Sequence, residues 1–177
     1  DVVYINTDVR WHTIGDAPPR GICGSGLVDL VAGMLHTGIV SDSGMMASAE
    51  EMAERAPQLA RRLSGNGRQR SFVVADRSEG AGGRALAITQ RDIRELQLAK
   101  GAIRAGVEIL MRELDITSTE VKRVYLAGAF GNYIKPASAL AIGLIPHFPN
   151  AEIVPVANAA GSGAKMALLS EAARSEA

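Results

Sequence analysis

Cysteine is almost absent from this chain: Cys23 is the only one among 177 residues. One thiol cannot form a disulfide within the chain, and it cannot supply the ligand set of a zinc or iron–sulfur site. The scarcity is typical of proteins that work in a reducing compartment, so we expect a cytoplasmic protein. No acidic or histidine cluster has metal-ligand spacing either, so we expect no metal site in this chain.

The sequence also lacks a net charge and a long apolar run. Lysine and arginine together number 19, the same as aspartate and glutamate. This balance gives no basic footprint for nucleic acid or for an anionic membrane. No apolar stretch approaches the ~20 residues that a membrane-spanning helix needs. The chain opens on strand-like residues without a signal peptide or an initiator methionine, and we therefore expect a piece of a longer protein.

What the sequence does contain is an alternation of helical and strand-like segments around glycine turns. This order predicts an α/β fold, with a mixed sheet flanked by helices. Apolar residues at helical spacing predict a helix over 27–35, and Gly38 is expected to end it. We interpret 41–70 as an insertion or a mobile subdomain edge, so that the domain proper consists of 1–40 and 71–177.

The later segments are predicted from caps, periodicity and β-branched runs. Thr89 and Asp92 form a capping box at the start of a long helix that ends near Leu114. The other predicted elements are a polar helix at about 50–63, strands at 71–75, 86–88, 124–127 and 153–156, and helices at about 137–142 and 163–173. The strand at 124–127 is expected to be buried.

A glycine-rich loop follows the strand at 124–127. Its residues are Gly128, Ala129, Phe130, Gly131 and Asn132. Glycine lets the backbone approach a flat ligand, such as a purine or its ribose, with no side chain in between. The loop is therefore a candidate nucleotide contact, and the alternative is a tight turn from strand to helix.

Four residues of the long helix share one face, because they lie three or four positions apart: Gln97, Lys100, Gly101 and Arg104. A glycine inside a helix costs roughly 1 kcal/mol relative to alanine, which is tolerated where something must approach closely. An amide and a cation on such a face are candidates for lining an adenine. The alternative is that Lys100 and Arg104 are ordinary solvated residues.

The densest glycine cluster opens the first helix with Gly24, Ser25 and Gly26. Free amides at the start of a helix favour a phosphate or ribose oxygen, so these three residues complete the candidate nucleotide site. The spacing differs from that of the dinucleotide fingerprint. Cys23 is expected to be a small buried residue rather than a nucleophile, because nothing places a histidine beside it.

A second glycine-rich segment, 158–165, looks at first like a phosphate loop. Ala164 separates Gly163 from Lys165, however, and the phosphate-loop pattern needs glycine directly before lysine. Close packing of a helix on a sheet is the better interpretation of these small residues.

Four segments in this order resemble the reductive activators of corrinoid proteins. They read Gly-Ile-Cys-Gly-Ser-Gly-Leu-Val-Asp at 21–29, Ile-Thr-Gln-Arg-Asp-Ile-Arg-Glu-Leu-Gln-Leu-Ala-Lys-Gly-Ala-Ile at 88–103, Leu-Ala-Gly-Ala-Phe-Gly-Asn-Tyr-Ile at 126–134, and Asn-Ala-Ala-Gly-Ser-Gly-Ala at 158–164. The resemblance covers nearly the whole chain and is weakest over 41–85.

The resemblance implies the C-terminal part of an actin-like ATPase, of the ribonuclease H-like sugar-kinase and heat-shock-chaperone superfamily. Such an activator uses ATP to return cob(II)alamin to cob(I)alamin on a corrinoid protein or a corrinoid-dependent methyltransferase. Its N-terminal ferredoxin domain holds a two-iron cluster. By position, 126–132 resembles the adenosine motif, the helix with Gln97 and Lys100 resembles the one that flanks adenine, and 158–164 resembles the second connecting helix at the domain hinge.

The chain departs from that superfamily in what it lacks. It has no Asp-x-Gly-Thr loop of the kind that binds the β- and γ-phosphates and magnesium, and no cluster cysteines. We therefore expect the adenosine side of an ATP or ADP site, with no catalytic residue and no activity for this chain alone. Two alternatives stay open: a docking or dimerisation module without catalysis, and an activator of another radical or dehydratase system on the same fold.

Overall fold

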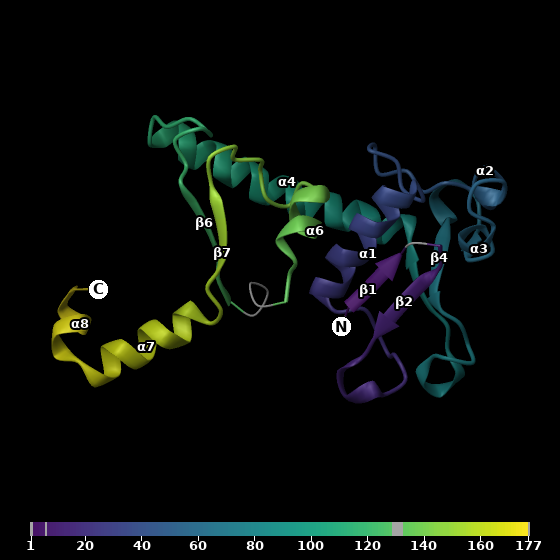
Figure 1. The fold of residues 1–177 in the computed structure, drawn as a ribbon, viewed down its shortest axis with the longest axis horizontal. Helices are drawn as coiled ribbons and strands as arrows, with labels where there is room; N and C mark the ends of the chain where they lie inside the picture. The colour runs from purple at the N-terminus through teal and green to yellow at the C-terminus, as the bar shows by residue number, and fades with distance from the viewer. Residues whose placement is uncertain (1, 6, 129–132, 177) are drawn as a thin grey trace.

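The computed structural model of the chain describes residues 2–5, 7–128 and 133–176. Figure 1 shows an N-terminal body on one side, a C-terminal arm on the other, and one long helix that connects them. The body contains β1 (Val2–Ile5), β2 (Val9–His12), η1 (Ile14–Asp16), α1 (Gly24–Thr37), α2 (Ala49–Ala53), α3 (Pro57–Ala60), β3 (Leu63–Ser64), η2 (Gly67–Gln69), β4 (Ser71–Ala75), η3 (Ala81–Gly83) and β5 (Leu86–Thr89).

The connecting helix is α4 (Gln90–Glu113), and the arm consists of β6 (Arg123–Leu126), β7 (Glu152–Pro155), α7 (Ala159–Leu169) and α8 (Glu171–Glu176). Between β6 and β7 the chain returns to the body, where α6 (Pro136–Ala141) packs against α1. The strands at 71–75, 86–88, 124–127 and 153–156 were therefore predicted to within one residue at each end.

The described strands form three small sheets. β1 and β2 pair antiparallel, and β3, β4 and β5 form an antiparallel sheet whose last pair shifts register between Val73 and Ala75. β6 and β7 pair in parallel, with Val124 opposite Ile153. Parallel pairing needs a crossover connection, and α6 lies within it.

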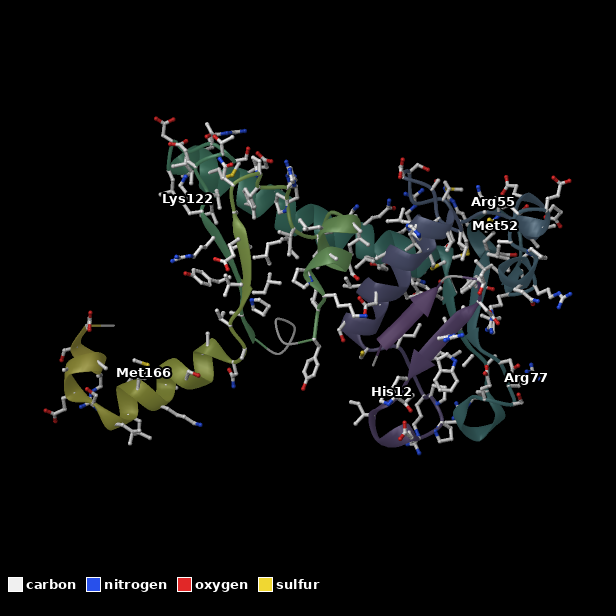
Figure 2. All side chains as sticks on the ribbon, viewed as in Figure 1. His12, Met52, Arg55, Arg77, Lys122 and Met166 are labelled. Atoms are coloured by element: carbon white, nitrogen blue, oxygen red, sulfur yellow. The ribbon has the colours of Figure 1, made fainter. Side chains whose placement is uncertain are left out.

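α1 ends where the sequence predicted. Gly38 follows the helix with a φ of +73°, and its amide donates to the Leu35 carbonyl at 3.1 Å. This left-handed position favours glycine, so the predicted end of the helix is confirmed. The Arg55 guanidinium donates to the Gly38 carbonyl at 3.1 Å, and Figure 2 shows Arg55 beside Met52 at this edge of the body.

The hydrophobic core lies in the body. It combines residues of α1, β4, β5 and the first turn of α4, and the largest fully buried side chains include Leu30, Met34, Phe72, Ile88 and Ile93. Full burial of one such side chain is worth about 1.5–3 kcal/mol. The stretch 41–70, interpreted as an insertion or mobile edge, adds Met46, Met52, Leu59 and Leu63 to the same core.

The single polar helix expected at 50–63 is wrong, because two short helices occupy this region. A capping box of Ser48 and Glu51 starts α2, and α3 begins at Pro57. Proline disfavours helical backbone at the residue before it, and Ala56 has a φ of −149°. The break therefore follows from one proline.

α4 starts where the capping box was predicted. The Asp92 amide donates to the Thr89 hydroxyl at 3.2 Å, and the Thr89 amide donates to the Asp92 carboxylate at 2.8 Å. Within the helix only Gln90 and Ile93 are buried, whereas Leu110 is 62% exposed. Despite its length, neither α4 nor any other helix in the described residues is apolar enough to cross a membrane.

The arm is far less buried than its sequence suggested. β6 alternates exposed and half-buried residues, so the expectation of a buried strand is wrong: its partner in the described sheet is β7 alone. α7 has no buried residue, and a Cβ at Gly163 would meet nothing within 4 Å. The expected close packing of 158–164 on a sheet is therefore not found among the described residues. The helix also starts earlier than predicted, at the Asn158 cap, and ends at the extended residue Ser170.

Candidate nucleotide-binding site

Gln97 lies on the face of α4 that turns toward the loop after α1. Its side-chain amide donates to the Ser43 carbonyl at 3.2 Å, and its carbonyl accepts from the Arg94 guanidinium at 2.6 Å. Both functional atoms of the side chain therefore have protein partners, and they hold the loop around Ser43 against the helix.

Lys100 is half-buried on the same face, and its ammonium donates to the Ile142 carbonyl at 2.6 Å. Ile142 is the C-terminal cap of α6, where carbonyl groups have no partner within the helix. A cation at this end also interacts favourably with the partial negative charge of the carbonyls. Lys100 is thus bonded to α6 rather than simply solvated.

Gln97 and Lys100 line one small cavity. Its volume is about 110 Å³, and apolar side chains of α1 and α4, among them Leu35 and Ile93, complete its wall. Ligand pockets usually measure about 300–1,000 Å³. The cavity is therefore too small for a whole nucleotide, and Gly128 does not line it.

Gly101 and Arg104 continue the α4 face toward the arm. Gly101 has an open surface, because a Cβ built on it would meet nothing within 4 Å. The Arg104 guanidinium donates to the Glu108 carboxylate at 2.8 Å, one turn further along, and its side chain is 53% exposed. Arg104 therefore matches the solvated alternative more closely than the ligand-lining one.

Gly128 is the second residue after β6, and two unusual backbone positions meet there. Its φ is +86°, and its amide donates at 2.7 Å to the carbonyl of Ala157, whose φ is +54°. Left-handed backbone costs a non-glycine residue about 1–2 kcal/mol, and such positions concentrate at functional sites. A Cβ on Gly128 would meet nothing within 4 Å, so its surface is open as well. Ala129, Phe130, Gly131 and Asn132 lie outside the described residues.

The glycine cluster at the start of α1 is capped by its neighbour. Cys23 is exposed, which corrects the expectation of a buried residue, and its sulfur accepts from the Gly26 amide at 3.3 Å. Its side chain turns back to cap the start of α1 instead of entering the core. Ser25 and Gly26 are buried, so the Gly26 amide is already occupied. Partial burial raises the pKa of the Cys23 thiol, but interactions that include the hydrogen bonds with Ser25 and Gly26 outweigh it and lower the pKa.

The predicted site residues thus lie in three separate places. Gln97 and Lys100 share a cavity, whereas Gly24 lies at the far end of α1, about 10 Å along the helix from Val31 of the cavity wall. Gly128 lies at the end of β6 that points away from α4 (Figure 1). Of these predicted residues, Gly101 and Gly128 have open surfaces, and they do not line one closed pocket.

The sequence reasoning did not single out Asp29, a buried acid on α1. Its carboxylate accepts from the Ser138 hydroxyl at 2.6 Å and lies 3.1 Å from the Lys135 ammonium. The available signal was an acidic residue inside an apolar helical stretch, because a charge there needs a partner.

A family profile for the C-terminal domain of RACo, the ASKHA domain, matches residues 2–177. The corrinoid activation enzyme RamQ of Eubacterium limosum is 34% identical over 166 residues, which make up 94% of this chain and 28% of that protein. A solved structure of a reductive activator for a corrinoid, iron-sulfur protein matches with a TM-score of 0.81 and 34% identity, over 99% of this chain and 27% of that one. The chain thus spans little more than a quarter of the length of these relatives.

Proposed function

Since the chain belongs to the family of the RACo C-terminal ASKHA domain, we propose that it forms the adenosine side of an ATP-dependent reductive activator of a corrinoid protein. The resemblance and the actin-like α/β fold that the sequence predicted are confirmed by this membership. The proposed partner is a corrinoid protein or a corrinoid-dependent methyltransferase, and the proposed location is the cytoplasm, where Cys23 would stay reduced.

The observation that carries the nucleotide proposal is the pair of open glycine surfaces. At Gly101 on α4 and at Gly128 after β6, a Cβ would meet nothing within 4 Å. Flat aromatic ligands approach backbone where no side chain intervenes. Both glycines lie in the segments that resemble the adenine-flanking helix and the adenosine motif, and this agreement supports the proposal.

The remaining parts of the activator are proposed to lie outside these 177 residues. The sequence has no Asp-x-Gly-Thr loop and a single cysteine. Contacts to the β- and γ-phosphates, to magnesium and to a two-iron cluster must therefore come from other residues of the protein. ATP, when bound, would supply the energy for an otherwise unfavourable electron transfer, while this chain binds and orients the adenosine.

The test is calorimetric titration of ADP into the full-length protein and its Gly128→Val variant. We expect at least a ~tenfold weaker binding, about 1.4 kcal/mol, because a β-branched side chain would stand where the base approaches. Gly128→Asn is the matched control for backbone strain, since asparagine tolerates the left-handed region. It should keep the fold and lose less affinity than valine.

Two further variants delimit the site. Lys100→Ala should weaken ADP binding less than Gly128→Val, because the ammonium contacts the protein at Ile142. Arg68→Ala, on an exposed turn of the body, should leave the affinity unchanged. If Gly128→Val, with native circular dichroism, binds ADP as tightly as the parent, the adenosine assignment is wrong.

One observation favours the docking module as a second candidate function. On α7, Met166, Leu168 and Leu169 are 63%, 81% and 84% exposed, and Figure 2 shows Met166 on the outlying part of the arm. Apolar side chains gathered on an unpacked helix are typical of an interaction surface. Leu168→Glu should abolish binding of the corrinoid protein if this function holds, and should leave the ADP affinity as it is.

A further inference from the structure

Asp29 is a carboxylate in the interior of the body. It sits on α1 between apolar neighbours, and its side chain is 4% exposed. Moving a charge out of water costs several kcal/mol unless partners compensate for it. The identity of those partners therefore indicates what the residue is for.

Both partners come from the first turn of α6. One carboxylate oxygen lies 3.1 Å from the ammonium of Lys135, the residue that caps α6, and the other accepts from the Ser138 hydroxyl at 2.6 Å. Ser138 is 109 residues away along the chain. One side chain of α1 thus holds two residues, three positions apart, at the start of a distant helix.

That helix start follows the candidate nucleotide-binding segment 128–132 in the sequence. Lys135 comes three residues after Asn132, the last residue of that segment. The upstream end is fixed separately, because the Gly128 amide donates to the Ala157 carbonyl at 2.7 Å. The opposite end of α6 is bonded to Lys100 of α4. The segment after the loop is therefore fixed to α1 and α4, while the segment before it is fixed to the arm.

We propose that Asp29 is a positioning residue for nucleotide binding: through Lys135 and Ser138 it fixes the start of α6, which follows the segment that resembles the adenosine motif. The inference rests on the proposed function. Asp29 touches no nucleotide in this role, because its carboxylate is occupied by α6. A buried ion pair adds little net stability compared with apolar residues, so conformational specificity is the better reason for its presence.

The test separates positioning from simple stabilisation with two substitutions. Asp29→Asn keeps the size of the side chain and an acceptor for Ser138, but leaves the Lys135 ammonium without its charged partner. Adding Lys135→Met removes the ammonium while keeping the stem. ADP titration and thermal unfolding are measured on the full-length protein, its Asp29→Asn variant and the double variant.

We expect Asp29→Asn to lower the unfolding midpoint and to weaken ADP binding about fivefold. The double variant should recover much of the unfolding midpoint. It should still bind ADP more weakly than the parent, because the start of α6 is no longer held by the charged contact with residue 29. Recovery of both properties, or ADP binding like the parent's in folded Asp29→Asn, would overturn the positioning role. Asp8→Asn is the matched control: it breaks another carboxylate pair, with Arg62, and should leave ADP affinity unchanged.

Hydrogen exchange without nucleotide provides the readout that is independent of binding. In Asp29→Asn, the amides of Ala139 and Ile142, which donate to the Lys135 and Ser138 carbonyls, should exchange faster, while those of β4 should not change. Unchanged exchange at Ala139 and Ile142 would also overturn the proposal. If the parent itself does not bind ADP, the proposed function fails together with the role of Asp29 in it. If the parent binds and the variants match it, only the role of Asp29 fails.

Discussion

The side-chain carbonyl of Gln90 accepts a hydrogen bond from the Met46 amide at 2.7 Å, across 44 residues of sequence. The side-chain amide of Gln90 donates to the Gly44 carbonyl, also at 2.7 Å. Gln90 is 3% exposed, so both bonds are sheltered from water. One residue at the start of α4 thereby satisfies two backbone groups of the loop that follows α1.

Replacing Gln90 with leucine should destabilise the protein by about 2–4 kcal/mol, because two buried backbone groups lose their partners and each costs about 1–3 kcal/mol. Urea unfolding measures this loss. Gln97→Leu is the control: its contacts with the same loop are less buried, and the change should cost less than 1 kcal/mol, about the net value of one hydrogen bond. Equal losses from the two substitutions would contradict the assigned role of Gln90.

Cys23 should be replaceable by serine but not by alanine. Its sulfur caps the Gly26 amide at the start of α1, and serine is a preferred residue at this position. We expect Cys23→Ser to keep or raise the thermal midpoint, and Cys23→Ala to cost about 1 kcal/mol. Identical midpoints for the two variants would show that the cap contributes nothing. A loss of ADP binding in Cys23→Ser, with the midpoint unchanged, would instead indicate a chemical role for the thiol.

Asp8 makes stability depend on acid pH. The hydrogen bond from the Arg62 side chain at 2.7 Å lowers the pKa of Asp8 below its ordinary value of 3.8, against a smaller effect of burial. Because the pKa is lower in the folded state, the stabilisation is complete above the unfolded pKa and disappears as the pH falls through the folded one. The Asp8 side chain is 48% exposed, so screening limits the effect to about 0.2–1 kcal/mol.

Unfolding of the parent and of Asp8→Asn measures this contribution. The parent should be more stable at neutral pH, and the difference should narrow below pH 3.8. High salt at neutral pH should narrow it as well. A difference that stays constant from neutral pH to about pH 2 would show that the ionised carboxylate is not its source.

Local signals in the sequence were sufficient where one or two residues decide the structure. The end of α1 depends on the left-handed backbone of Gly38, and the start of α4 depends on the exchange of hydrogen bonds between Thr89 and Asp92. Both features depend on contacts between residues close in sequence, so the local sequence is sufficient to predict them. The fold as a whole was predicted from the family resemblance.

The site could be predicted only in part, because its contacts join distant segments. Nothing near Lys100 in the sequence indicates that its ammonium bonds to the Ile142 carbonyl, 42 residues away. The bond between Asp29 and Ser138 is equally invisible to periodicity. The exposure of β6 was missed for a related reason: an apolar run predicts a buried strand only when other elements cover it.

α4 acts as a lever arm. A helix of 24 residues is about 36 Å long, and its buried side chains, Gln90 and Ile93, lie in its first turn. A tilt of α4 by about 5° around its buried first turn moves the far end of the helix by roughly 3 Å, which is comparable to the length of a hydrogen bond. Seating of the first turn, which Gln90 helps to fix, therefore affects where β6 and β7 lie relative to the body. Small changes of packing in the body are thus amplified into larger displacements of the arm.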